Sequence, residues 1–256
     1  MGNKYSGIIF DYGGTLDTRG DHWSEVIWDG YVHEQVAVNK QAFRAAYVYA
    51  ERALAVNPIV KTNSHFIDIL NAKIRLQLAF LCGRELLYTG KDDAEKQQQL
   101  CSLLNFSEEQ INATATRIAE YINGITKSLL DENRSVLEYI RQKGLPMVLV
   151  SNFYGNINTV LCDAGIDTFF QKVIESAVVG VRKPNPAIFA LGVCALDVPC
   201  SEVLVVGDSY TKDILPAKEL GCHTVLIKGR QWESAVCDES ICDAVVTRLA
   251  DIKELI

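Results

Sequence analysis

Short apolar runs, each ending in a polar side chain, recur along this chain. The first run covers residues 7–10 and stops at Asp11, and similar runs stop at Ser151 and at Asp208. A run of four to eight apolar residues bounded by turn residues is typical of a strand that is buried on both of its faces. The pattern predicts strands over residues 7–10, 146–152, 172–175, 202–208, 223–227 and 244–246.

Stretches with helical spacing separate these runs in the second half of the chain. The predicted helices cover residues 131–143, 156–164, 186–196 and 211–220. Strands that alternate with helices predict a parallel sheet covered on both faces. The expected fold class is therefore α/β, with a three-layer Rossmann-like core.

Residues 19–128 have a different pattern, because no convincing strand interrupts them. Apolar positions recur at helical spacing over 39–56 and 64–82, and Ser107 opens a capping box that predicts a helix through about 127. We therefore expect a core domain made of residues 1–18 and 129–256, with an all-helical cap domain of residues 19–128 between the two pieces. Because the insertion leaves directly after the first strand, we expect it to cover the ligand-binding edge of the sheet.

Composition and charge narrow the class of partner. The chain has 256 residues, of which 22% are charged, and a net charge of −7. A dispersed acidic balance argues against general binding of nucleic acid or of membrane surfaces. No apolar run reaches the length of a membrane span, and the N-terminus lacks the apolar core of a secretory signal. We expect a cytoplasmic protein, a monomer or a homodimer, whose partner is a small molecule.

Polar residues that follow the strands suggest a metal site. Asp11 and Asp208 each follow a predicted strand, Ser151 ends another, and Lys183 stands in a Pro-rich segment. If the strands are parallel, these groups meet at one edge of the sheet. Carboxylates brought together in this way repel one another, and Mg²⁺ is typically held by one or two carboxylates together with phosphate oxygens.

These segments resemble the four motifs of the haloacid dehalogenase superfamily, most of whose members are Mg²⁺-dependent phosphatases. The first motif resembles the stretch from Phe10 to Leu16, and the second is Ser151 after its strand. The third is Gly180-x-x-Lys183-Pro184, and the fourth runs from Val205 to Ser209 with Asp213 at the family's spacing. The motifs stand in the family's order and span nearly the whole expected core.

The resemblance implies a role for each of these residues. Asp11 is similar to the nucleophile that forms an aspartyl-phosphate, with Ser151 and Lys183 as the other catalytic groups. The implied phosphate-binding residues are Gly14, Ser151, Asn152 and Lys183. The implied Mg²⁺ ligands are Asp11, the carbonyl group of Gly13, Asp208 and Asp213. The expected function is that of a Mg²⁺-dependent phosphomonoesterase acting on a small phosphorylated metabolite.

One position departs from the family pattern. Phosphatases of the family usually carry an aspartate two residues after the nucleophile, where this chain has Gly13. That aspartate acts as the general acid and base, a role typically worth about 10²–10⁴ in rate. The first interpretation is a slow or specialised phosphatase that acts on good leaving groups, or one that recruits another acid. Asp17, Asp21 and His22 are candidates for that acid, although a loop or surface position is the default prediction for each.

Three further interpretations stay open at Gly13. Dehalogenases of the family also lack the aspartate, but they work without Mg²⁺. Phosphonoacetaldehyde hydrolase carries a small residue there and forms a Schiff base on a cap lysine, for which Lys40, Lys61 and Lys73 are candidates, although a solvated helix face is the default for each. The last interpretation, from outside the enzymes, is a regulatory protein that binds a phosphate ligand on a retired catalytic scaffold.

Overall fold

The computed structural model describes residues 4–84, 87, 103–232 and 237–256. The chain divides into two compact units, one made of residues 1–25 and 126–256 and the other of residues 26–125. In the described part of the chain, no helix is long and apolar enough to cross a membrane.

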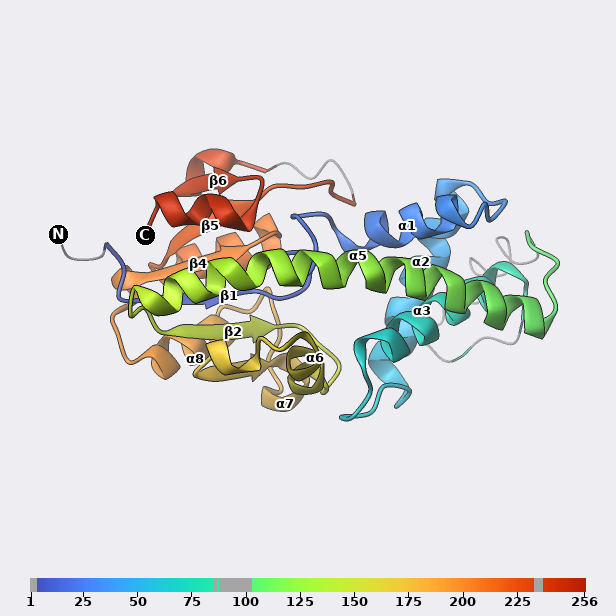
Figure 1. Cartoon of the computed structure of the whole chain (residues 1–256), viewed down its shortest axis with the longest axis horizontal. Coiled ribbons are helices and arrows are strands. Elements are labelled where there is room, and N and C mark those ends of the chain that lie inside the picture. The colour runs from blue at the N-terminus through green and yellow to red at the C-terminus, as the bar shows by residue number, and fades with distance from the viewer. Residues whose placement is uncertain (1–3, 85–86, 88–102, 233–236) are drawn as a thin grey trace. The chain divides into compact units, whose positions relative to one another are not determined.

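The first unit is built on a parallel sheet of six strands in the order β3-β2-β1-β4-β5-β6. Figure 1 shows the blue β1 beside the yellow-green β2 and the orange β4, although long stretches of sequence separate the three. The strands are β1 (Gly7–Phe10), β2 (Met147–Ser151), β3 (Lys172–Glu175), β4 (Val203–Gly207), β5 (His223–Ile227) and β6 (Ala244–Val246). All six predicted strands are present, because fully apolar runs such as β1, β2 and β4 are stable only where both faces of the sheet are covered.

Helices of the same unit cover this sheet. They are α6 (Ile157–Ala164), α7 (Ser176–Val179), α8 (Ala187–Leu196) and α9 (Leu215–Glu219). One apolar cluster joins α8 residues Phe189 and Val193 to Ile9, Val150 and Val205 of the three central strands. The helix predicted over 211–220 instead begins with a π-helical turn, Tyr210–Ile214, before α9.

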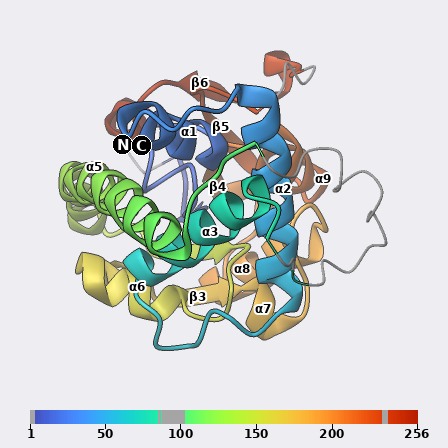
Figure 2. The same ribbon diagram turned by 90° about the vertical axis from the view of Figure 1, so that its right-hand side faces the viewer.

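The second unit is helical in its described residues. Its helices are α1 (Trp23–His33), α2 (Lys40–Val56), α3 (Phe66–Leu81) and the first half of α5 (Glu108–Gln142). Figure 2 shows α2 and α3 side by side, and residues of the two helices are in contact. The predicted capping box is present, since the Ser107 hydroxyl accepts from the Gln110 N–H at 3.2 Å and the Ser107 N–H donates to the Gln110 side chain at 2.8 Å. Residues 85, 86 and 88–102 of the predicted helical insertion lie outside the described residues.

Helix α5 corrects one boundary of the prediction. Separate helices over about 107–127 and 131–143 were expected, but α5 is one continuous helix of 35 residues. Neither glycine nor proline stands between residues 125 and 143 to end it. Buried positions continue through the expected break at helical spacing, namely at Ile122, Thr126, Leu130, Asn133 and Leu137.

Lys73 of α3 is also a correction. A solvated helix face was expected for it, but its side chain is buried and pairs with Glu51 at 2.5 Å. The predicted class, an α/β core with a parallel sheet and a helical insertion after the first strand, is confirmed. The role of that insertion as a cap stays a prediction.

Candidate active site

The carboxyl ends of the central strands bring the candidate residues together. Asp11 directly follows β1, Ser151 is the last residue of β2, and Asp208 directly follows β4. Phe10 pairs in register with Leu149 on one side and with Val206 on the other, so these ends lie at the same edge of the sheet. All three side chains are buried. This is the edge at which open parallel sheets bind ligands.

Lys183 links two of the carboxylates. Its ammonium group donates a short hydrogen bond to Asp11 Oδ1 and a second one to Asp213 Oδ1, at 2.8 Å. Asp213 also accepts from the backbone N–H of Ser209 at 3.0 Å, which fixes its other oxygen. The side chains of Lys183, Asp11 and Asp213 are at most 7% exposed, so the two ion pairs are shielded from water.

Asn152 holds Lys183 in place through its side chain. The amide oxygen of Asn152 accepts from the Lys183 N–H at 2.9 Å, and its amide nitrogen donates to the Lys183 carbonyl group at 3.0 Å. The sequence suggested only a phosphate contact for Asn152, through its backbone N–H. The pair of hydrogen bonds to the Lys183 backbone was not predicted, because nothing in the sequence pairs two residues that stand 31 positions apart.

The charges of this site do not balance. When all groups are ionised, Asp11, Asp208 and Asp213 oppose one ammonium group, which leaves an excess of two negative charges. Burial raises the pKa of Asp11 to about 6, although Lys183 acts in the opposite direction. Burial and the neighbouring carboxylates of Asp11 and Asp213 raise the pKa of Asp208 well above its usual range. Burial disfavours the Lys183 ammonium ion, but the two carboxylates outweigh it and raise the pKa of Lys183.

Of the three carboxylates, Asp208 has the fewest partners to offset its negative charge. Among the described residues it forms no ion pair, and its one hydrogen bond comes from the Thr15 hydroxyl at 3.4 Å. The same hydroxyl lies 3.2 Å from Asp11 Oδ2. Asp11, Asp208 and Asp213 each offer an oxygen within 4.8 Å of the others. Hard oxygen ligands with excess negative charge fit a divalent cation such as Mg²⁺.

The loop after β1 places a further buried carboxylate, that of Asp17, close to these residues. Asp17 Oδ1 accepts from the Gly14 N–H at 2.7 Å, and Oδ2 accepts from Trp23 Nε1 at 3.1 Å. Asp17 is 1% exposed, and burial raises its pKa to about 8 even though the Gly14 N–H lowers it. A loop or surface position was expected for Asp17, and it does lie in the loop after β1, but its side chain is buried.

The other two candidates for a recruited acid are engaged elsewhere. Asp21 forms an ion pair with Arg230 at 2.6 Å. The ring of His22 makes a hydrogen bond with Ser24 at 2.8 Å and packs against Trp232.

Gly13 leaves room where the family carries its aspartate. A Cβ atom built on Gly13 meets nothing nearer than Trp23 Nε1, at 3.6 Å, which is ordinary van der Waals distance. Trp23 therefore stands at the place toward which a longer side chain at position 13 would extend. The described contacts of the site give the Gly13 carbonyl group and the Ser151 hydroxyl no hydrogen-bond partner, so their predicted roles rest on position alone.

Gly14 is confined far more tightly than Gly13. Its φ of +102° is strained for any other residue, and an added Cβ would lie 2.3 Å from Asp208 Cγ. We expect Gly14→Ala to lower the melting temperature by more than Gly144→Ala does, because Gly144 has a similar φ of +73° with open space around it. Strain alone costs about 1–3 kcal/mol, or several degrees for a chain of this size. If thermal denaturation shows that the two variants lower the melting temperature equally, the predicted clash with Asp208 is contradicted.

Comparison with known proteins agrees with this architecture. Residues 5–221 match the family model described as haloacid dehalogenase-like hydrolase. A "Haloacid dehalogenase-like hydrolase domain-containing protein 3" of Danio rerio is 32% identical over 110 residues, which are 43% of this chain and 46% of that protein. A phosphoglycolate phosphatase of Pectobacterium atrosepticum is 35% identical over 125 residues, 48% of this chain and 53% of that protein. The matched region is thus about half the length of these relatives.

Solved structures extend the likeness of fold to the whole chain. A HAD-hydrolase of Bacillus subtilis, solved bound to magnesium, superposes with a TM-score of 0.55 at 14% identity and covers 98% of both chains. The family model spans most of the chain, and the four motif segments meet at one edge of its sheet. The chain belongs to the haloacid dehalogenase-like hydrolase family.

Proposed function

We propose that this protein is a Mg²⁺-dependent phosphomonoesterase that works through an aspartyl-phosphate on Asp11. One observation carries the proposal. Three buried carboxylates lie close together, a single lysine pairs with two of them, and an excess of negative charge remains at the ligand-binding edge of the sheet. A cation and a dianionic phosphoryl group together complete such a site better than a neutral substrate does.

Each residue of the cluster has a chemical task in this proposal. Asp11 attacks phosphorus, and Lys183 holds its carboxylate in one orientation while facing the phosphoryl oxygens with a positive charge. Ser151 donates its hydroxyl to the same oxygens, and the backbone N–H of Asn152 lines the approach, whereas the Gly14 N–H donates to Asp17 instead. Asn152 acts in addition on Lys183, whose backbone it holds at both polar groups.

The acidic residues are the proposed ligands of Mg²⁺. Asp11, Asp208 and Asp213 supply carboxylate oxygens, and Gly13 supplies its carbonyl oxygen. Bound there, Mg²⁺ neutralises charge on the phosphoryl group and on the attacking carboxylate. In support, a fold relative from Bacillus subtilis was solved bound to magnesium, and relatives of 32–36% identity are named as phosphatases of phosphoglycolate, phosphoserine and glyceraldehyde 3-phosphate.

The substrate in this proposal is a small phosphorylated metabolite whose leaving group needs little protonation. Gly13 provides no acid, and Asp17 uses both of its oxygens to accept N–H groups. An ester whose leaving group is already a weak base suits such a site, since little rate is lost when no proton is supplied.

The direct test is a panel of phosphate esters assayed with Mg²⁺ and with EDTA. We expect phosphate release from an activated aryl phosphate, and we expect EDTA to lower kcat/KM by at least about 100-fold, because charge neutralisation at phosphorus is worth several kcal/mol. Added Mg²⁺ should restore the rate. Turnover that EDTA leaves unchanged would contradict the proposed cofactor.

Other outcomes of the same assay identify the competing interpretations. Chloride release from a 2-haloacid without Mg²⁺ would indicate a dehalogenase. Borohydride trapping of substrate on Lys40, Lys61 or Lys73 would indicate phosphonatase chemistry. Binding of a phosphate analogue with no turnover of any ester would indicate a regulatory protein.

A further inference from the structure

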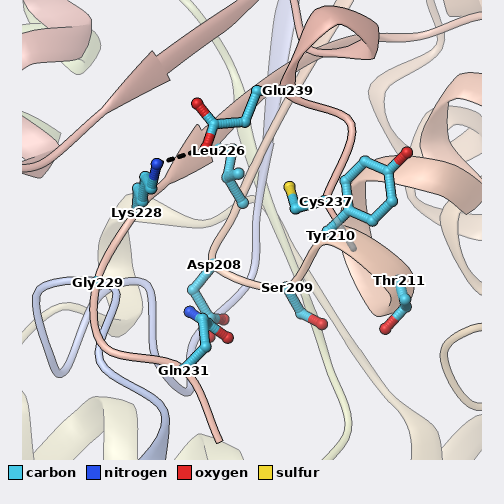
Figure 3. Close-up of a pocket in the computed structure, with 10 residues that line it drawn as sticks. All are labelled: Asp208, Ser209, Tyr210, Thr211, Leu226, Lys228, Gly229, Gln231, Cys237 and Glu239. Carbon is cyan, nitrogen blue, oxygen red and sulfur yellow. Dashed lines mark hydrogen bonds and ion pairs between the residues drawn. The ribbon is translucent and has the colours of Figure 1, made fainter. Parts of the chain in front are cut away.

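A pocket opens beside the acidic cluster, on its β5 side. Asp208 belongs to both, since it lines the pocket and shares the Thr15 hydroxyl with Asp11. Figure 3 shows the pocket between the turn after β4 and the chain that follows β5. Its volume is about 120 Å³, whereas a single water molecule needs only about 10–15 Å³ on a comparable measure. The pocket is therefore large enough for an organic group.

The inner lining of the pocket is apolar. Leu226 is buried near the end of β5, and Tyr210 and Cys237 line the same space. Cysteine behaves as a small hydrophobic side chain in such a position.

Polar groups of the pocket are found toward its rim. Lys228 and Glu239 form an ion pair at 2.5 Å and are each about half exposed. Gln231 donates from Nε2 to the carbonyl group of Gly20 at 3.1 Å. An apolar interior with a few polar groups around it is the usual character of a small-molecule site.

Residues 228–231 form one wall of the pocket, and hydrogen bonds connect this wall to the loop that follows β1. The Arg230 guanidinium group donates to Asp21 Oδ2 at 2.9 and 2.6 Å, and its backbone N–H donates to Asp21 Oδ1 at 2.7 Å. The His22 N–H donates to the Arg230 carbonyl group at 2.8 Å. The backbones of Gly20 and Gly229 are so close that an added Cβ on Gly229 would lie 2.3 Å from Gly20 C. One wall of the pocket is thus hydrogen-bonded to the loop that carries Asp11 and Gly13.

We propose that this pocket binds the aromatic ring of an aryl phosphate whose phosphoryl group is bound by Ser151 and Lys183 beside Asp11. The inference rests on the proposed function, and it names the class of leaving group. A planar ring can pack against the apolar lining at Leu226, and the pocket adjoins the cluster because Asp208 belongs to both.

The leaving-group chemistry points to the same class. A phenol has a pKa of about 10, whereas an aliphatic alcohol is close to water at about 16. Asp11 attacks phosphorus, the bond from phosphorus to the aryl oxygen breaks, and the phenolate leaves with the bonding electrons and takes a proton from water. Water then attacks the aspartyl-phosphate, releases phosphate and restores Asp11. The first step works without the acid that Gly13 lacks.

The test introduces a large side chain into the pocket and compares two substrates that both have good leaving groups. Cys237→Trp should lower kcat/KM at least tenfold for phenyl phosphate, mainly through KM, and change it less than twofold for acetyl phosphate, which carries no ring. Cys194→Trp, at an exposed position of α8, is the matched control and should change neither value. If Cys237→Trp fails to fold, Tyr210→Ala should raise KM for phenyl phosphate while Tyr210→Phe retains it.

A binding measurement separates this inference from the proposed function. In the Asp11→Asn background, calorimetry should give phenyl phosphate a Kd at least tenfold higher when Cys237→Trp is added, with the Kd of inorganic phosphate unchanged. Pocket-dependent binding in a protein that turns over no ester would reject the proposed function and keep the inference. Turnover of phenyl phosphate that Cys237→Trp leaves unchanged, with an unchanged Kd, would reject the inference and keep the function.

Discussion

Asp11→Asn is expected to lower kcat for any phosphate ester by at least about 10⁴-fold, the scale on which hydrolases lose activity when their covalent nucleophile is removed. The amide oxygen can still accept from Lys183, so the buried network of Lys183 and Asp213 keeps its shape. What is lost is the negative charge that attacks phosphorus. Steady-state phosphate release, measured beside wild type, gives the size of the effect.

The covalent intermediate gives a second measurement of the same change. Acid quenching of wild type with a ³²P-labelled ester should leave label on the protein, and the Asp11→Asn protein should retain none. Asp131→Asn, at a carboxylate that is 77% exposed on α5, is the matched control and should behave as wild type. An Asp11→Asn protein that keeps wild-type turnover, with an unchanged circular dichroism spectrum, would exclude Asp11 as the nucleophile.

Gly13→Asp should raise kcat for alkyl phosphates by about 10²–10⁴-fold, the usual contribution of a general acid. The position accepts the change sterically, since an added Cβ has 3.6 Å to its nearest neighbour and Gly13 has no positive φ. The new carboxylate would extend toward Trp23 Nε1, a donor that now serves Asp17. For aryl phosphates, whose leaving groups are weak bases, the gain should be much smaller.

Gly13→Asn separates the effect of proton transfer from the effect of size. Asparagine has nearly the same volume as aspartate but no acidic proton, so this variant should not raise kcat for either class of ester. A lower kcat in Gly13→Asp would instead indicate that another group already transfers the proton. Asp17 is then the first residue to test, because it is buried in the same loop.

Much of the fold was predictable because it depends on local patterns. The apolar runs of β1, β2 and β4 predict buried strands wherever they stand, and their alternation with helices allows few arrangements other than a parallel sheet. The break expected near residue 128 was wrong, because neither glycine nor proline ends the helix there. The burial of Leu130 and Asn133 continues the buried face of α5 through this point.

The candidate site was predictable to the extent that it follows strand ends. Asp11, Ser151 and Asp208 could be placed at one edge of the sheet by topology alone, and Lys183 and Asp213 by the likeness of their segments to family motifs. The partners of these groups were not predictable in the same way. The paired hydrogen bonds from Asn152 to Lys183, and the ion pair from Arg230 to Asp21 across 209 positions, depend on how loops meet after folding.

The sequence by itself determined which strands end in polar side chains and that position 13 carries no acid, because residue type and spacing suffice for both. Only the tertiary structure decided what surrounds them. It placed Trp23 beside Gly13, buried Asp17 beneath the same loop, and left Asp208 between an acidic cluster and an apolar pocket. The physical reason is that burial and charge compensation depend on segments brought together across the whole chain, which no local pattern records.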